Sequence, residues 1–475
     1  MSMQQNDSKI LGYLPNDVPP VGHIILLGFQ HVLTMFPATV LVALLVGFHV
    51  STVLMASGLA TIVALIGSRW GIGKFIPLYY GSSFSYIAAT LAITGASFGQ
   101  PVSDELISVA QAGIVVTGVV NVVMGLVIRY AGGKQTIDKI LPPIVTGSVA
   151  AVIGFALGFA ALDMASGNCC GATGSSSWWI IALVTVVSTI LYSVYLQGRG
   201  FIGMLPILLG AITGYIIAIP MGLVDFSTIT NANIITAPHI TFPSFSHDLA
   251  LTAIISIAVM AIATIPESTA HLYQISLYVD HLAEETGRQK YHLDFHVGFN
   301  LILDGLGDLV NGLLGGVAGT NYGENNSLMV ITRNYSGPAL MAAGAFAILL
   351  SFSGTLAGLI HSVPTAVSGG LAIYLFGVIG MQGIALMMSH KVNLFDPKQL
   401  AIGAVVMVIG IGGHIGFPNG FLPISFLSSV FPNGWPAIAT GAMAGIILNG
   451  IFLVFKPPVR ESVETDLALE SGAAD

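Results

Sequence analysis

Apolar stretches of about 20 residues follow one another along most of this chain, separated by short breaks rich in glycine, proline and charge. A stretch of that length crosses a hydrocarbon core of about 30 Å as an α-helix. The pattern predicts fourteen membrane-spanning segments, at residues 24–48, 51–68, 79–97, 105–130, 142–162, 178–197, 201–223, 249–279, 297–317, 321–335, 338–361, 365–389, 398–416 and 434–455. We therefore predict an all-α polytopic membrane protein.

Composition supports this fold class. Of the 475 residues, 54% are hydrophobic and 8% are charged, whereas a soluble domain carries roughly 25% charged residues. The sequence contains no cluster of lysines and arginines that would indicate a nucleic-acid partner. The two cysteines, Cys169 and Cys170, are adjacent, a spacing that suits neither a disulfide nor a metal site. No nucleophile–base pair or metal cluster is evident, so we expect neither an enzyme nor a cofactor.

The cationic residues test the number of spans. If the N-terminus is cytoplasmic, fourteen crossings place all 14 lysines and arginines on the cytoplasmic side, as the positive-inside rule requires: Lys9, Arg69, Lys74, Arg129, Lys134, Lys139, Arg199, Arg288, Lys290, Arg333, Lys391, Lys398, Lys456 and Arg460. Both termini are therefore predicted to be cytoplasmic.

The spans divide into two halves of seven. The resulting organisation is a cytoplasmic tail (1–22), a first seven-span repeat (23–225), an extracellular loop (226–248), a second seven-span repeat (249–456) and a cytoplasmic tail (457–475). His31 and Phe84 are 53 residues apart, and so are His271 and Glu324. Because each half contains an odd number of spans, the two repeats would be inverted, a recurrent plan in secondary transporters.

The third and tenth spans begin unlike ordinary membrane helices. Their starts, "YYGSSFSYIA" and "TNYGENNS", are polar and contain glycine. Interrupted helices at corresponding positions of two repeats indicate a binding site near the middle of the membrane. The N–H groups exposed at such a helix start favour a carbonyl or anionic oxygen.

Ionisable residues within spans are costly and are functional candidates. Glu267 and His271 are four residues apart, so they share one helix face, although they could also be a structural pair. Glu324 could bind a ligand or cap its own helix. Asp304 and Asp308 are either a second polar face or a structural hydrogen-bond site. Two intramembrane carboxylates and a histidine suggest proton coupling, because substrate binding can favour one protonation state.

The segments "FQHVLTMFPATVLV", "GSSFSYI", "PES-TAH" and "TNYGENNSLMVITRNYS" resemble the nucleobase–ascorbate transporter family, also called nucleobase:cation symporter-2, and within it the bacterial uracil permease branch. The resemblance runs from about residue 20 to 455. It implies core spans 1–4 and 8–11, gate spans 5–7 and 12–14, short antiparallel strands in spans 3 and 10, an elevator-like mechanism and a homodimer in the cell membrane.

The resemblance also implies site residues. Glu267 and Glu324 match the acids that bind the base, and Gly323 supplies a backbone contact. Phe84 and Ala38 match positions that line the pocket.

Other residues match coupling, closing or supporting positions. His271, with Glu267, matches the proton-coupling pair, and Phe376 falls where an aromatic side chain closes over the base. The supporting residues are Gln30, His31, Ser83, Tyr322 and Asn325.

Glutamate stands at position 324, where xanthine and urate carriers of the family usually have glutamine, and this difference favours uracil as the substrate. The expected coupling ion is the proton. The double amide in "ENN" and the proline before Glu267 depart from the family pattern. A xanthine or urate carrier therefore remains an alternative. An anion carrier of similar architecture would instead need a basic or hydroxyl-rich site.

Overall fold

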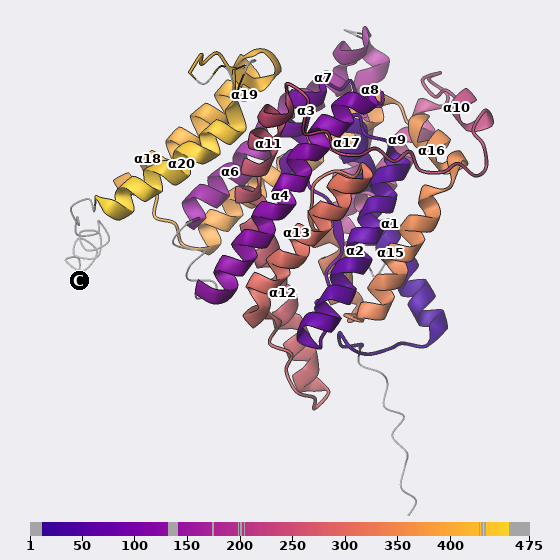
Figure 1. Cartoon of the computed structure of the whole chain (residues 1–475). Coiled ribbons are helices and arrows are strands. Elements are labelled where there is room, and N and C mark those ends of the chain that lie inside the picture. The colour runs from indigo at the N-terminus through magenta and orange to yellow at the C-terminus, as the bar shows by residue number, and fades with distance from the viewer. Residues whose placement is uncertain are drawn as a thin grey trace, which may run out of the picture.

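The computed structural model describes residues 12–131, 141–172, 175–197, 199, 202–203, 205–426, 428, 431 and 434–455 (Figure 1). The predicted C-terminal tail, half of the N-terminal tail and the lysines at 134 and 139 lie outside these residues.

Helices dominate the described residues. The helices are α1 (Val21–Val46), α2 (Val50–Ile72), α3 (Ile87–Thr94), α4 (Asp104–Ala131), α6 (Pro143–Ala156), α7 (Gly158–Ser166), α8 (Ser176–Tyr195), α9 (Pro206–Ala218), α10 (Ser227–Thr230), α11 (Ala250–Val259), α12 (Ala261–Glu285), α13 (Val297–Leu314), α14 (Gly323–Thr332), α15 (Gly337–Ser351), α16 (Gly354–His361), α17 (Thr365–Ser389), α18 (Pro397–Met407), α19 (Gly413–Gly416) and α20 (Ala437–Val454). The strands are β1 (Tyr80–Ser82), β2 (Gly319–Asn321), β3 (Phe421–Leu422) and β4 (Trp435–Pro436).

Among the described residues, ten helical segments are long and apolar enough to cross a membrane, and three shorter apolar helices cover Phe84–Thr94, Pro206–Ala218 and Gly337–Ser351. The protein is thus a mostly helical polytopic membrane protein, as the hydrophobic pattern predicts.

Several predicted spans are interrupted, among them those at 249–279 and 338–361. The segment expected at 338–361 is divided into two helices, α15 and α16. The hydroxyl of Ser353 accepts the N–H of Leu356 and so caps the start of the second helix. The segment expected at 249–279 divides at Met260 into α11 and α12 and extends to Glu285. Pro266 lies one to two turns after this break, where it removes an N–H from the helix and crowds the carbonyl four residues earlier.

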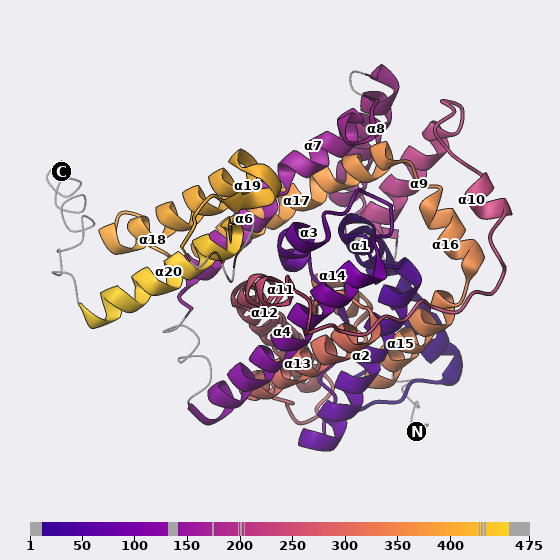
Figure 2. The same cartoon turned by 45° about the horizontal axis from the view of Figure 1, so that its top comes forward.

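The helices pack in two sets. One set contains α1–α4 and α11–α15, with its closest packing between α4 and α13 and between α2 and α15. The other contains α6–α9 and α17–α20, in which α17 packs on α6, α7 and α8. In Figure 2 the yellow helices α18 and α20 lie beside α6 at one edge of the molecule, away from α2 and α15.

Glycines permit the close contact of α4 with α13. A Cβ atom at Gly118 would lie 2.7 Å from the carbonyl oxygen of Gly305, and one at Gly125 would lie 2.6 Å from that of Gly298. Such backbone-to-backbone approach is the usual basis of helix association in lipid. The α4–α13 contact therefore depends on the absence of side chains at these positions.

A two-stranded antiparallel sheet interrupts the helical pattern. β1 pairs with β2 in the register Tyr80↔Asn321, Gly81↔Thr320 and Ser82↔Gly319. The strands stand at the glycine-rich starts of the spans predicted at 79–97 and 321–335, and each is followed by a short helix, α3 or α14. The polar segments singled out in the sequence are therefore extended chain leading into half-length helices.

Several cations gather at one end of the bundle. Arg288 donates two hydrogen bonds of 2.7 Å to Asp17, Lys74 donates to the Tyr291 carbonyl, and Arg333 pairs with Glu285. Burial alone would raise the pKa of Asp17, but Arg288 and the Leu14 N–H outweigh it and hold that pKa below its ordinary value. The first contact ties the N-terminal segment to the residues after α12, and the other two join the end of α2 to the segment before α13 and the end of α14 to that of α12.

We predict that Gly118→Ala lowers the free energy of unfolding by about 1–3 kcal/mol, because the added methyl group must displace the backbone of α13. Thermal unfolding of the purified protein in detergent would measure this as a lower Tm.

The matched control is Gly450→Ala in α20, where an added Cβ meets no atom within 4 Å. Its Tm should be unchanged or slightly higher, because alanine favours the helix over glycine. Equal effects at the two positions would show that the α4–α13 contact is not the cause.

Candidate functional site

A cavity of about 500 Å³ lies between the two sets of helices. The strand ends, α12 and the start of α14 form one wall, and residues of α6, α8, α9 and α17 form the other. Its size is typical of small-molecule sites, which are often few in number and lie between packed units.

The acidic side chains and the histidine meet in this cavity. Glu267 and His271 lie one turn apart on α12, and Glu324 lies in the first turn of α14. All three are half-buried and line the cavity. A Cβ at Gly323 would lie 3.1 Å from Nε2 of His271, so the imidazole packs directly against the start of α14.

Two helix starts also face the cavity. Ser83 and Phe84 line it at the beginning of the short 3₁₀ turn Phe84–Tyr86 that precedes α3, and Gly323 begins α14. The hydroxyl of Ser83 accepts the N–H of Ser85 at 3.2 Å. The first N–H groups of a helix lack partners within it, so these starts offer donors beside the carboxylates.

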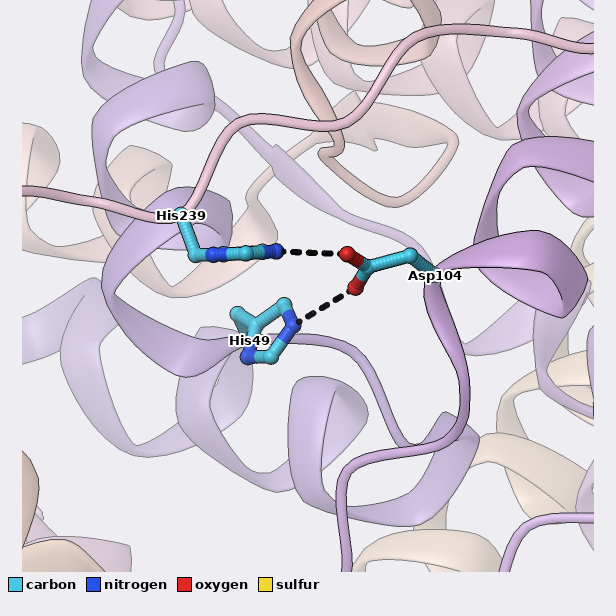
Figure 3. Close-up of side chains that lie close together, drawn as sticks. All are labelled: His49, Asp104 and His239. Atoms are coloured by element: carbon cyan, nitrogen blue, oxygen red, sulfur yellow. Dashed lines mark hydrogen bonds and ion pairs between the residues drawn. The ribbon is translucent and has the colours of Figure 1, made fainter.

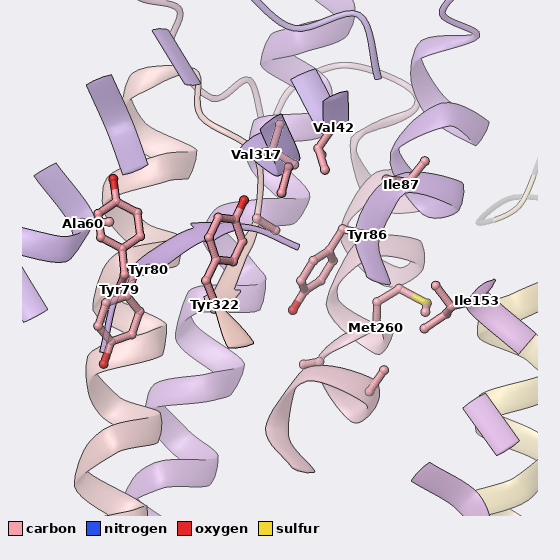
Figure 4. Packing of buried hydrophobic residues seen from close by; sticks show 14 of the residues in the cluster. Val42, Ala60, Tyr79, Tyr80, Tyr86, Ile87, Ile153, Met260, Val317 and Tyr322 are labelled. Atoms are coloured by element: carbon pink, nitrogen blue, oxygen red, sulfur yellow. The ribbon is translucent and has the colours of Figure 1, made fainter. Parts of the chain in front are cut away.

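Tyr322 joins the strands to α1. Its hydroxyl donates to the Ser82 carbonyl at 3.0 Å and lies 2.9 Å from the hydroxyl of Thr39. Its ring stacks on Tyr79, 6.2 Å between centroids, within the packed aromatic residues of Figure 4. Gly81 is required there, because a Cβ atom would lie 2.4 Å from the Tyr322 ring.

Asn325 joins α14 to α1. Its amide nitrogen donates to the His31 carbonyl at 3.1 Å and lies 3.1 Å from Nδ1 of the same residue. The neighbouring Gln30 has a buried Oε1 without a hydrogen-bond partner among the described residues. Neither His31 nor Gln30 lines the cavity.

Asp308 holds the start of β2. Its carboxylate accepts the N–H of Gly319 at 2.7 Å and the amide of Asn121 at 2.9 Å. Of the two alternatives for the Asp304–Asp308 pair, Asp308 therefore fits the structural hydrogen-bond site. Ser268 similarly accepts the amides of Asn300 and Asn321 at 2.7 and 2.6 Å.

The structure brings most of the predicted site residues together, but not all. Phe84, Glu267, His271, Gly323, Glu324, Ser83 and Tyr322 line the cavity. Ala38 and Phe376 are buried and are not among its lining residues. The ring of Phe376 instead packs edge-on against Phe84, with centroids 6.3 Å apart.

The opposite wall contains polar residues that the sequence analysis missed. Tyr374 and Gln382 of α17 line the cavity on that wall, and Gln274 of α12, also missed, lines it on the wall with the acidic groups. Gln382 is a lone amide in the apolar run "FGVIGMQGIAL", which is the signal that could have identified it.

Comparison with known proteins gives consistent results. A model of the permease family (Xan_ur_permease) matches residues 22–418. The uracil permease of Bacillus caldolyticus is 34% identical, over 94% of this chain and 96% of its own, and that of Escherichia coli K12 is 34% identical over 83% and 86%. The putative pyrimidine permease RutG of E. coli K12 is 32% identical over 94% and 93%.

Solved structures show the same fold in more distant proteins. The transmembrane domain of a cyanobacterial bicarbonate transporter, BicA, has a TM-score of 0.60 and 16% identity, covering 85% of this chain and 98% of its own. The murine anion transporter Slc26a9 has a TM-score of 0.63 and 13% identity, covering 94% and 70%.

We predict that Asp308→Ala lowers the free energy of unfolding by about 1–3 kcal/mol, because the buried N–H of Gly319 and the amide of Asn121 both lose their acceptor. The loss should appear as a lower Tm in detergent. Asp248→Ala, at an exposed position, is the matched control and should leave Tm unchanged; a wild-type Tm for Asp308→Ala would contradict the supporting role.

Proposed function

The chain belongs to the permease family that matches most of its length, and from this premise we propose that it imports uracil by proton symport. As a permease it is a transporter, not an enzyme. The observation that carries the choice of substrate is the pair of glutamates, Glu267 and Glu324, beside a helix start in one cavity.

The cavity offers groups complementary to a pyrimidine. Uracil has two N–H donors and two carbonyl acceptors on its ring edge. The carboxylates of Glu267 and Glu324 can accept from the ring N–H groups in charge-assisted bonds, the stronger kind. The backbone N–H groups at Gly323 and near Phe84 can donate to the carbonyls, and the Phe84 ring provides a stacking face. A base lacking these N–H groups would leave a carboxylate unpaired, and the site would reject it.

Proton coupling rests on the same residues. A charged carboxylate within a membrane is costly, so a base that hydrogen-bonds one protonation state of Glu267 shifts the proton equilibrium, and the proton shifts base binding reciprocally. His271, one turn from Glu267 and packed against Gly323, would assist the movement of the proton to and from Glu267.

We extend the proposal to the architecture. The ten long helices, the three shorter apolar ones and α14 would make fourteen spans in two inverted repeats. The equal spacing of His31 to Phe84 and of His271 to Glu324 supports this plan. The set with α1–α4 and α11–α15 would be the core and the other set the gate, with the cavity between them.

Transport would then be an elevator-like movement of core against gate in a homodimer. The cations gathered around Asp17, Tyr291 and Glu285 would mark the cytoplasmic side of the cell membrane, with both termini there.

The solved anion transporters share the fold, but fold alone does not assign a substrate. Two glutamates and no lysine or arginine are found among the described residues that line this cavity, and such a lining repels an anion. A nucleobase fits the charge of the site better.

The decisive experiment is uptake of labelled uracil into proteoliposomes, with and without an inward proton gradient. We expect gradient-driven uptake that excess unlabelled xanthine does not reduce. Inhibition by xanthine would support the xanthine or urate alternative, and the absence of uracil uptake under any gradient would overturn the proposal.

We predict that Glu324→Gln and Glu267→Gln each weaken uracil uptake by about tenfold or more, since one charge-assisted bond contributes about 1.5–3 kcal/mol. Glu105→Gln is the matched control: Glu105 is exposed at the start of α4 and does not line the cavity. Unchanged uptake in both cavity variants would rule out the glutamates as the base-binding groups.

A further inference from the structure

Two histidines and an aspartate meet at the end of the bundle opposite the cations (Figure 3). His49 lies in the turn between α1 and α2, Asp104 is the first residue of α4, and His239 comes from the long connection between α10 and α11. Both imidazole rings direct Nε2 at the carboxylate of Asp104, one at each oxygen.

The separations of these atoms suit a metal ion. Nε2 of His239 lies 2.9 Å from Oδ2 of Asp104, and Nε2 of His49 lies 3.5 Å from Oδ1. One ligand atom from each residue can be chosen so that all three lie within 4.8 Å of one another. Ligand atoms about 2.0–2.2 Å from a tetrahedral zinc ion lie about 3.3–3.6 Å apart, so small movements of the exposed Asp104 and His239 side chains and of the half-buried His49 would complete the geometry.

The Nε2 atom of His49 makes no hydrogen bond of normal length with the described residues. The atom is shielded from solvent, and its contact with Asp104, at 3.5 Å, is longer than a normal N–H···O bond. A salt bridge alone accounts for His239 but leaves this atom unsatisfied, whereas a metal ion would engage both nitrogens.

Side chains of α2 and α4 already hold the segment that contains His239. The hydroxyl of Thr52 donates to the His239 carbonyl at 2.6 Å, which fixes His239 beside the start of α2. Farther along, Gln111 of α4 donates to the Thr241 carbonyl at 2.8 Å. The connection is thus attached to α2 and α4 on either side of the site. Metal binding would therefore cost little conformational entropy for ordering this segment.

We propose that His49, Asp104 and His239 form a binding site for a zinc-type divalent cation, with water in the remaining position. Two imidazoles and a carboxylate suit zinc, nickel or copper, whereas calcium and magnesium prefer oxygen ligands throughout. None of the three residues lines the transport cavity, so the site is separate from substrate binding. A bound ion would tie the α10–α11 connection to α2 and α4.

No metal site was expected from the sequence, because the three ligands are far apart along the chain. A second group, Asp280, His292 and Asp294, also brings three such atoms together. There the carboxylates are already engaged: Asp280 accepts the N–H groups of Tyr291 and His292, and Asp294 accepts from Ser276. We therefore assign the site to the first group.

The test is calorimetric titration of zinc chloride into the purified full chain in detergent, prepared without a histidine tag. We expect a binding event that His239→Gln weakens by about tenfold or more, as loss of a ligand should cost at least what loss of an outer-shell partner does. Asp104→Asn should weaken it similarly. Asparagine retains an oxygen that can accept from His239, so this variant tests the charge with the fold preserved.

His292→Gln is the matched control and should retain the event. A wild-type protein that binds no zinc, zinc binding unaffected by both His239→Gln and Asp104→Asn, or a loss confined to His292→Gln would each overturn the assignment. Tm values measured without zinc identify any variant that is simply misfolded. The readout does not involve transport, so it is independent of the proposed function.

Discussion

Backbone hydrogen bonding in a medium without water is the constraint on which the rest of this structure depends. A helix that stops within the membrane exposes N–H and C=O groups that lipid cannot satisfy. Here the two extended segments that precede α3 and α14 satisfy one another by pairing as β1 and β2. The N–H of Ser83 and that of Tyr322 extend this pairing to the carbonyls of Ala318 and Tyr79. The pairing allows two helix starts to exist inside the protein, and both face the cavity.

The polar residues around the sheet follow from the same constraint. Asp308, Tyr322 and Ser268 bond to the backbone or side chains of the strands and their neighbours. Asn325 attaches the helix after β2 to α1. These side chains would be costly in a membrane if they were unpaired. They hold an irregular segment in place, and Glu324 and Gly323 are positioned as a result.

The cavity lies where the two sets of helices meet. One wall is built on the strand pair and α12, and it contains the acidic groups. The other is built on helices such as α17, which contribute Tyr374 and Gln382. A site divided between two packing units changes when they move relative to each other, which is the requirement of alternating access. The proposed metal cluster lies on the first unit, at its surface, and so leaves the contact between the units free.

The linear pattern was enough to establish the class of the protein. Runs of about 20 apolar residues can hardly fold otherwise than as membrane helices, and the family resemblance through "TNYGENNS" agrees with the family match. Pattern also located Glu267, His271 and Glu324, because an ionisable residue in an apolar run is conspicuous. It placed the boundaries of 249–279 and 338–361 less well, since a break within a continuous apolar run depends on local backbone geometry and capping, such as the Ser353 cap of α16.

Tertiary structure decided which residues share a space. Phe376 packs against Phe84 instead of lining the cavity, whereas Gln382 lines it. The two lie on different faces of one helix, and the packing of α17 against its neighbours decides which face meets the cavity. His49, Asp104 and His239 meet because a connection crosses the ends of α2 and α4. Hydrophobic periodicity reports which face of a segment is apolar, and it contains no information on which distant segment will cover that face.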